Sequence, residues 1–316
     1  MMSYIIRRTI MAIPLLIGIT ILSYVIIRMA PGDAASLMID PSLKPEDKIK
    51  LQEKMGVNDP IYIGYFKWVS DIVQGDFGTS YIKRGTDVGE LIWNRMPNTI
   101  LLMVSSTLIA AIIAIPFGIY SAMRPYSPLD YTATFISFLG VSIPAFWFGI
   151  MLIMFFSVNL QWFPTGGVGP IGEEFSIWTR LHHLVLPAFV LAVADTAALT
   201  RYTRSSMLDV LKQDYIRTAK SKGFKERKVV LKHGVRNGMI PIITMFGLML
   251  PSFIGGAAIT EKIFAWPGIG QLFIDSANQR DYPVIMALTV ISAVLVVVGN
   301  LIADILYAMC DPRIEY

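Results

Sequence analysis

Long apolar runs separated by polar stretches make up most of the chain. A transmembrane helix needs about 20 consecutive apolar residues to cross about 30 Å of hydrocarbon. Several runs meet this length, and the pattern therefore predicts an all-α integral membrane protein with six transmembrane helices. The six runs lie near 9–29, 98–122, 131–157, 183–203, 238–260 and 283–309.

The first run also has features of a secretory signal peptide. Arg7 and Arg8 precede it, and the small residues Ala34 and Ala35 follow it. However, its apolar stretch over 9–27 is longer than the roughly 7–15 residues of a signal-peptide core. We therefore predict that residues 1–29 form a short N-terminus and a retained first helix.

The distribution of charge predicts which side each loop faces, because cytoplasmic loops are enriched in lysine and arginine. The stretch 201–238 holds eleven Lys/Arg against three Asp/Glu, whereas 30–97 holds eight against ten. Six crossings would place 201–238 and both termini in the cytoplasm, with 30–97 outside. We therefore expect a multi-pass protein of the cell (inner or cytoplasmic) membrane. Further basic residues fall on the cytoplasmic side of this scheme: Arg7, Arg8, Arg124 and Arg313.

The outer stretch 30–97 is too long for a simple connection. Residues 45–54 favour a helix, and a second helix is predicted from Ile61 to Ile72, between Asp59-Pro60 and Gly75. We expect a small helical cap between the first and second transmembrane helices. It could only seal the helix ends, or it could receive something delivered from outside.

Residues 98–316 form the predicted core, with helices two to six. In the second run, small residues recur every four positions, which lets another helix approach closely in lipid. These residues are Ala110, Ala114, Gly118 and Ala122. Prolines inside or beside the spans favour kinks: Pro116, Pro144, Pro187, Pro241 and Pro251.

Composition excludes several classes of function. With 54% hydrophobic and 16% charged residues and a mean hydropathy of +0.57, the chain is too apolar for a water-soluble globule. Its single cysteine, Cys310, allows no intrachain disulfide and no thiolate cluster. No phosphate-binding loop, zinc-binding helix or nucleophile elbow occurs. We predict no catalytic, cofactor-binding or metal-binding residues in this chain, and no nucleic-acid partner.

Few charges lie inside the spans, where they are costly and often functional. Asp195 lies in the fourth run and could line a translocation path or bond between helices. Together with Pro144 and Trp147 it is our candidate for a path or gate. Asn300 and Asp304, near the end of the sixth run, are expected to be packing or interface groups.

The basic stretch 201–238 is patterned like a helix, a turn and a second helix. Apolar positions recur at helical spacing before Gly223, and a second helical piece covers 225–232. Ala219 and Gly223 are one turn apart and would leave room for a partner. The alternative is a basic helix lying on anionic lipid. The apolar positions that recur at helical spacing before Gly223 are Leu208, Leu211, Tyr215 and Ala219.

This stretch resembles the cytoplasmic coupling loop of ABC-importer permeases, in the form used by peptide permeases. It reads Asp-Tyr-Ile-Arg-Thr-Ala-Lys-Ser-Lys-Gly over 214–223, followed by His233, Arg236-Asn237 and Pro241. Arg217-Thr218-Ala219 takes the place of the broad family's Glu-Ala-Ala, and Gly223 takes the place of its glycine. The glutamate is missing and the proline comes later, as in the peptide-type variant.

Five further blocks resemble the first permease subunit of dipeptide and oligopeptide importers, so the resemblance covers nearly the whole chain. They are Gly-Asp-Phe-Gly-Thr-Ser-Tyr at 75–81 with Arg-Met-Pro-Asn-Thr at 95–99, Ser-Ile-Pro-Ala-Phe-Trp at 142–147, Phe-Ala-Trp-Pro-Gly-Ile-Gly at 264–270, Arg-Asp-Tyr-Pro at 280–283, and Asp-Pro-Arg at 311–313.

The resemblance implies a type I ABC-importer permease that passes peptides inward by alternating access. It implies a homologous second permease, two cytoplasmic ATPase subunits that bind ATP and Mg²⁺, and an external peptide-binding protein. The residues that it assigns to ATPase coupling are Asp214, Arg217, Thr218, Ala219, Gly223, His233, Arg236 and Asn237.

Other functions stay open at this point. Related machinery imports nickel chelates, glutathione or oligosaccharides. A stand-alone secondary carrier or channel would transport without ATPases, and a membrane-anchored interaction protein would use the basic helix as a lipid-binding foot. The interaction protein leaves the outer cap and the kinked spans unexplained.

Overall fold

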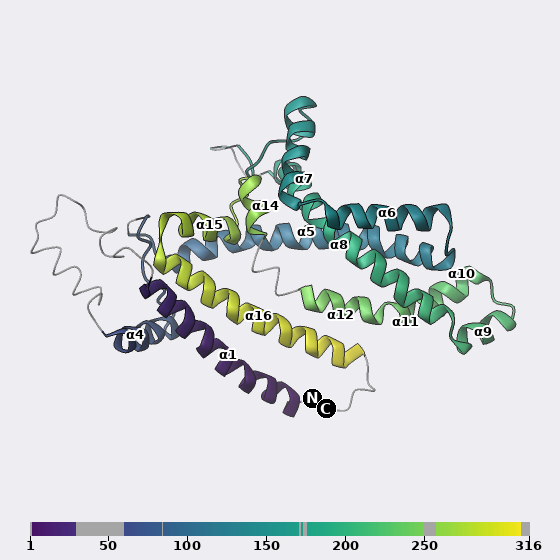
Figure 1. The fold of residues 1–316 in the computed structure, drawn as a ribbon, viewed down its shortest axis with the longest axis horizontal. Helices are drawn as coiled ribbons and strands as arrows, with labels where there is room; N and C mark the ends of the chain where they lie inside the picture. The colour runs from purple at the N-terminus through teal and green to yellow at the C-terminus, as the bar shows by residue number, and fades with distance from the viewer. Residues whose placement is uncertain are drawn as a thin grey trace, which may run out of the picture.

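The computed structural model describes residues 2–29, 60–83, 85–170, 172, 176–249 and 257–310. The part of the chain that it describes is almost entirely helical (Figure 1). The main helices are α1 (Met2–Met29), α4 (Ile61–Val73), α5 (Val88–Met123), α6 (Pro128–Ser142), α7 (Ala145–Leu152), α8 (Ile177–Leu211), α12 (Ile240–Met249), α14 (Ala258–Ile263), α15 (Ile269–Gln279) and α16 (Tyr282–Cys310).

Side-chain caps fix where several of these helices begin. Asp87 accepts a hydrogen bond from the Glu90 backbone N–H at 2.8 Å and starts α5. Ser127 caps α6, and Pro128 follows it in the first helical turn, where a missing N–H costs nothing. Ser176 caps α8 in the same way.

Helices α5 and α8 form the centre of the bundle and run in parallel. Ala110, Ala114 and Ala122 are buried, and a Cβ at Gly118 would collide with Thr203 of α8. The predicted stripe of small residues is therefore the surface on which α8 packs. Helix α16 packs between α1 and α12 (Figure 1).

Among the described residues, four helices are long and apolar enough to cross a membrane by themselves, namely α1, α5, α8 and α16. The predicted third span is broken at Pro144. Helix α6 and the pair formed by α7 and the π-helix η1 (Ile153–Asn159) are bent by 100° relative to each other. Proline disfavours helix in the residue before it, so Ile143 is extended and the chain turns there.

The bent pair crosses the bundle. Helices α5 and α8 both end where Ala122 packs on Met207, and near their starts Arg180 donates a hydrogen bond to Asn98. The chain must therefore return across the bundle between Met123 and Ile177. The fifth predicted span is described only as far as Met249, so the count of six is confirmed in part.

The two ends of the bundle differ in what they carry. One end, called here the outer end, carries α4, α14 and α15 (Figure 1). The opposite end, called here the coupling end, carries the polar segment after α8. The predicted helix over 61–72 is confirmed as α4, whereas the predicted helix over 45–54 lies outside the described residues.

Candidate functional site: the segment between α8 and α12

The basic segment folds as a helix, a turn and a second helical stretch at the coupling end (Figure 1). Helix α8 continues to Leu211, and α9 (Asp214–Ser221) follows after a short turn. Then come α10 (Glu226–Val229), the π-helix η2 (Val230–Val235) and α11 (Arg236–Gly238), which leads into α12. The predicted turn at Gly223 between two helical pieces is confirmed, with the second piece longer than expected. The first piece is not one continuous helix as predicted, because the chain turns at Lys212 and Gln213, and the buried apolar residue is Ile216, not Tyr215.

The inner face of α9 packs on its own chain. Ile216, Ala219 and Val229 are 1%, 8% and 0% exposed and form one apolar cluster with Leu211. Ala219 was expected to leave room for a partner. Its methyl group instead lies against this cluster, because the stripe of α9 that carries it faces α10.

Gly223 ends α9 with a backbone conformation that L-residues rarely adopt. Its φ is +80°, and a Cβ added there would meet no atom within 4 Å. Glycine takes this conformation without steric cost. Within this chain the turn therefore accounts for glycine at this position, and the space beside its Cα is open.

The outward face of α9 is polar and exposed. Arg217 and Asp214 form an ion pair at 3.3 Å between Nη1 and Oδ1, with side chains 79% and 94% exposed. Such a pair adds little stability in water. Thr218 is also exposed and donates from Oγ1 to the Asp214 carbonyl at 2.9 Å. These three side chains are available to another molecule.

Helix α9 is hydrogen-bonded to the stretch that leads to α12. Asn237 donates from Nδ2 to Tyr215 Oη at 3.0 Å and to the His233 carbonyl at 3.3 Å. His233 is half-buried and Arg236 is exposed. The residues assigned by resemblance thus divide between the exposed face of α9 and its attachment.

Sequence reasoning missed the residues that join this segment to α8. Met207 is fully buried, and Cβ atoms at Gly234 or Gly238 would press on its side chain. Ser206 donates from Oγ to the Gly238 carbonyl at 2.8 Å. The spacing of Gly234 and Gly238, four residues apart, is the small-residue signal that could have identified this contact.

A second missed feature is a partly buried ion pair at the coupling end. Arg204 of α8 donates to Asp130 of α6 through Nε at 2.7 Å and Nη2 at 2.9 Å. Asp130 is 3% exposed and also accepts from the Tyr126 backbone N–H at 2.9 Å. Two parallel bonds fix orientation as well as distance. The pair holds the start of α6 on α8, ten residues before α9.

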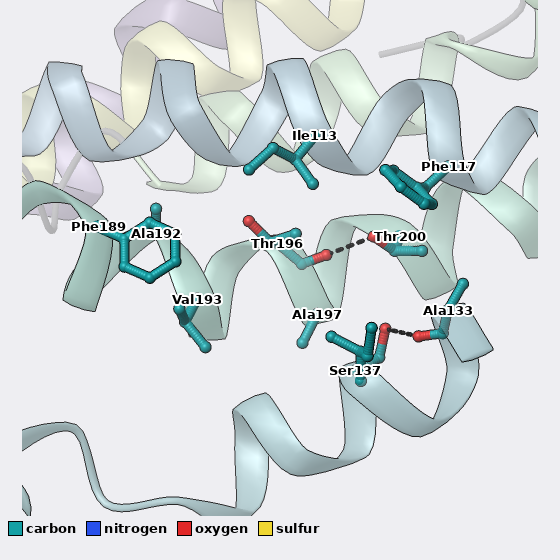
Figure 2. Close-up of a pocket in the computed structure, with 11 residues that line it drawn as sticks. Ile113, Phe117, Ala133, Ser137, Phe189, Ala192, Val193, Thr196, Ala197 and Thr200 are labelled. Atoms are coloured by element: carbon teal, nitrogen blue, oxygen red, sulfur yellow. Dashed lines mark hydrogen bonds between the residues drawn. The ribbon is translucent and has the colours of Figure 1, made fainter. Parts of the chain in front are cut away.

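Figure 2 shows a cavity of about 220 Å³ between α5, α6 and α8. Two of its three hydroxyls bond within their own helices, since Thr200 Oγ1 donates to the Thr196 carbonyl and Ser137 Oγ to the Ala133 carbonyl, both at 2.7 Å. The cavity is therefore an apolar space. It is lined by Ile113, Phe117, Ala133, Ile136, Ser137, Phe189, Ala192, Val193, Thr196, Ala197 and Thr200.

None of the three candidate path or gate residues lines this cavity. Asp195 is half-buried, three to four residues from Ala192 and Leu199, and therefore lies toward the face of α8 that packs on α5 and α12. Pro144 caps α7 at the bend, and Trp147 is 48% exposed. The structure does not gather them into one site.

A buried carboxylate organises the outer end, outside the spanning helices. Glu261 of α14 is fully buried and accepts from Thr99 Oγ1 and the Gln271 backbone N–H, both at 2.8 Å. Burial raises the pKa of the Glu261 carboxyl above its usual value, and the hydrogen bonds from Gln271 and Thr99 oppose this change. Nearby, Trp266 donates from Nε1 to the Asn98 carbonyl at 2.9 Å.

The described residues contain no group of three or more His, Cys, Asp or Glu side chains placed to hold a metal ion. The fold and the site together define a multi-pass helical membrane protein. Its polar surface at the coupling end is carried by α9 and by the exposed basic residues of the stretch that follows it.

Comparison with known proteins identifies the family. Residues 114–316 match the binding-protein-dependent transport system inner membrane component, and residues 1–103 match the N-terminal region of such membrane components. The chain belongs to this family of transport permeases.

The relatives include several named permeases that match over their full length. The oligopeptide transport system permease protein AppB of Bacillus subtilis is 66% identical over 316 residues, covering 100% of both chains. The dipeptide transport system permease protein DppB of Alkalihalophilus pseudofirmus is 37% identical over 334 residues, again covering 100% of both. The glutathione transport system permease protein GsiC of Salmonella typhimurium is 36% identical over 316 residues, with the same coverage.

A solved structure shares the fold. The inward-facing MetNI methionine ABC transporter matches with a TM-score of 0.53 and 16% identity. The match covers 70% of this chain and 96% of that one.

Proposed function

We propose that this chain is a membrane-spanning permease subunit of an ATP-driven importer that passes oligopeptides into the cytoplasm. The observation that carries the proposal is α9, an exposed polar helix that is fixed to both α8 and the root of α12. In this proposal the coupling end faces the cytoplasm and the ATPase subunits bind ATP and Mg²⁺. A homologous second permease and an external peptide-binding protein complete the assembly.

The contacts of α9 explain how movement of an ATPase could reach the membrane. The Ile216–Ala219–Val229 cluster and the Tyr215–Asn237 hydrogen bond hold α9 against α10 and α11. Met207 and Ser206 hold α11 against α8. A displacement of α9 therefore moves α8 and α12 together, and these helices pass between inward- and outward-facing states.

The experiment that tests coupling is Gly223→Trp in the reconstituted importer. A bulky side chain in the open space beside the turn would prevent an ATPase from seating on α9. We expect ATP hydrolysis stimulated by loaded binding protein to fall at least tenfold, with membrane insertion intact. Gly75→Trp at the outer end, where φ is +85° and a Cβ also meets no atom within 4 Å, is the matched control. Undiminished stimulation in Gly223→Trp would refute the coupling role.

The identity of the substrate rests on relatedness. The 66% identity to an oligopeptide permease favours oligopeptides, and the 36–37% relatives named for dipeptides and glutathione leave those as the second candidate. Uptake of labelled oligopeptides, competed by glutathione, dipeptides, nickel chelates or oligosaccharides, tests this choice. Transport by the purified chain alone in liposomes would instead support a stand-alone carrier or channel.

A further inference from the structure

Helix α4 packs against the last turns of α1 through an aromatic contact. The Tyr24 ring lies 5.7 Å from the Tyr65 ring and 5.5 Å from the Trp68 ring, measured between centroids. The Tyr24 hydroxyl occupies the space where a Cβ of Gly64 would lie, so glycine is needed for this approach. Thr20 Oγ1 and Tyr65 Oη are hydrogen-bonded at 3.0 Å.

The position of this contact along α1 gives the depth of α4. The apolar stretch of α1 lies between Arg8 and Arg28, and these twenty residues span about 30 Å of helix, the thickness of the hydrocarbon. Thr20 lies eight residues before Arg28, or about 12 Å inside that end. A helix that touches α1 from Thr20 to Tyr24 therefore lies at the depth of the acyl chains.

The sides of α4 differ in a way that fits this depth. Gly64, Tyr65 and Trp68 face α1. A second side is apolar and open, with Tyr62, Phe66 and Val73 exposed by 65%, 69% and 80%. A third side carries Lys67 and Ser70 together with Ile63, and Gln74 follows at the end of the helix.

The neighbouring turns of α1 are also apolar and exposed on the side away from α4. There Leu22, Ile26 and Met29 are exposed by 63%, 58% and 75%. Within the described residues α4 contacts mainly α1. A large exposed apolar side at acyl depth, next to a lipid-facing span, fits hydrocarbon and does not fit water.

We propose that α4 is embedded in the outer leaflet, where Tyr62, Phe66 and Val73 contact lipid acyl chains and Lys67 and Ser70 face the headgroups. The outer cap is then an interfacial anchor that steadies the end of α1. In this arrangement α4 does not serve as a platform for a partner in water.

Site-directed spin labelling of the full chain, purified in its native assembly and placed in lipid nanodiscs, tests this. With Cys310 replaced by Ala, nitroxides are attached at Phe66→Cys and, as a matched control one residue on, at Lys67→Cys. We expect the label at 66 to collide with oxygen several-fold more than with a water-soluble nickel chelate, and the label at 67 to show the reverse preference.

Two results would overturn the proposal. If the label at 66 prefers the nickel chelate, the apolar side of α4 faces water. If it is shielded from both reagents, protein covers that side, either the segment before α4 or a second subunit. Neither result bears on the coupling role of α9, which lies at the opposite end of the bundle.

Discussion

Gly223 is a residue at which two explanations for glycine can be separated by experiment. Its φ of +80° requires a residue that tolerates the left-handed region, and asparagine tolerates it far better than alanine or branched residues. If only the turn matters, Gly223→Asn should keep most of the stimulated ATP hydrolysis and Gly223→Ala should lose more. If a partner backbone instead approaches Gly223 closely, both variants should lose stimulated ATP hydrolysis. The reconstituted importer would then hydrolyse ATP at an equally low rate with either variant.

Asp195 is a half-buried carboxylate within a span. It does not line the cavity of Figure 2, and it lies one turn before Leu199, which packs against α5 and α12, so its position favours packing between helices. We therefore expect Asp195→Asn, which keeps size and hydrogen-bonding capacity, to assemble normally and to transport peptide within twofold of the wild-type rate. A loss of uptake of tenfold or more with normal assembly would place Asp195 on the translocation path.

Glu261 predicts a dependence of stability on pH. Because its pKa is raised in the folded protein, this group contributes most to stability below the unfolded value of about 4.3, and that contribution is lost as pH rises through the folded pKa. Glu261→Gln keeps an acceptor for the Gln271 N–H and is neutral throughout. Melting temperatures between pH 4 and pH 8 should therefore fall less in Glu261→Gln than in the wild type.

The exposed Glu90→Gln at the same end is the control for Glu261, and its curve should follow that of the wild type. Parallel curves for all three proteins would show that Glu261 does not influence stability in this range. Glu261→Ala should melt at a lower temperature than Glu261→Gln at every pH. It leaves two buried donors without an acceptor, at a cost of about 1–3 kcal/mol each.

At the scale of elements, the Asp130–Arg204 pair joins α6 to the helix that leads into α9. Removing Arg204 takes two hydrogen bonds from the Asp130 carboxylate, at a cost of about 1–3 kcal/mol, because the arginine side chain is partly exposed and water can replace it. Arg204→Ala should therefore lower the melting temperature and reduce stimulated hydrolysis. The melting temperature of Arg204→Lys should lie between those of the wild type and Arg204→Ala, because an ammonium cannot form both bonds in the same plane. Arg201→Lys, at an exposed position one turn earlier, should resemble the wild type.

The elements also show what the sequence could and could not predict. Apolar run length located α1, α5, α8 and α16, because a span is set by a local property of the chain. The small residues from Ala110 to Ala122 correctly indicated a close helix contact. The bend at Pro144 was recognised as a kink, but its 100° magnitude depends on what α7 packs against.

Within the candidate site, helical periodicity located α9 and the turn at Gly223. It could not tell which small residue faced inward. Ala219 and Gly223 share a face in a straight helix, yet Ala219 packs on Val229 because the turn folds α10 back over α9. The partnership of Asp130 with Arg204, which are 74 residues apart, depends on how α6 and α8 pack, and no local pattern encodes it.

At the scale of the whole molecule, the ends of the bundle can be assigned to the two sides of the membrane. Eleven Lys/Arg against three Asp/Glu in 201–238 predict that the coupling end faces the cytoplasm, since basic loops are retained there. In a Cys310→Ala background, Ser221→Cys on α9 and Ile82→Cys at the outer end give one reporter on each side. Both positions are exposed, so access depends on the side of the membrane alone.

An impermeant maleimide applied to intact protoplasts should label Ile82→Cys and spare Ser221→Cys until the membrane is opened. Labelling of Ser221→Cys in intact protoplasts would show that the molecule has the opposite orientation in the membrane. Helix α9 would then lie out of reach of cytoplasmic ATPases. It would leave the contacts of α9 with α8 and α11 unchanged, because these belong to the fold and not to its orientation. The labelling experiment therefore tests the proposed importer function separately from the fold that supports it.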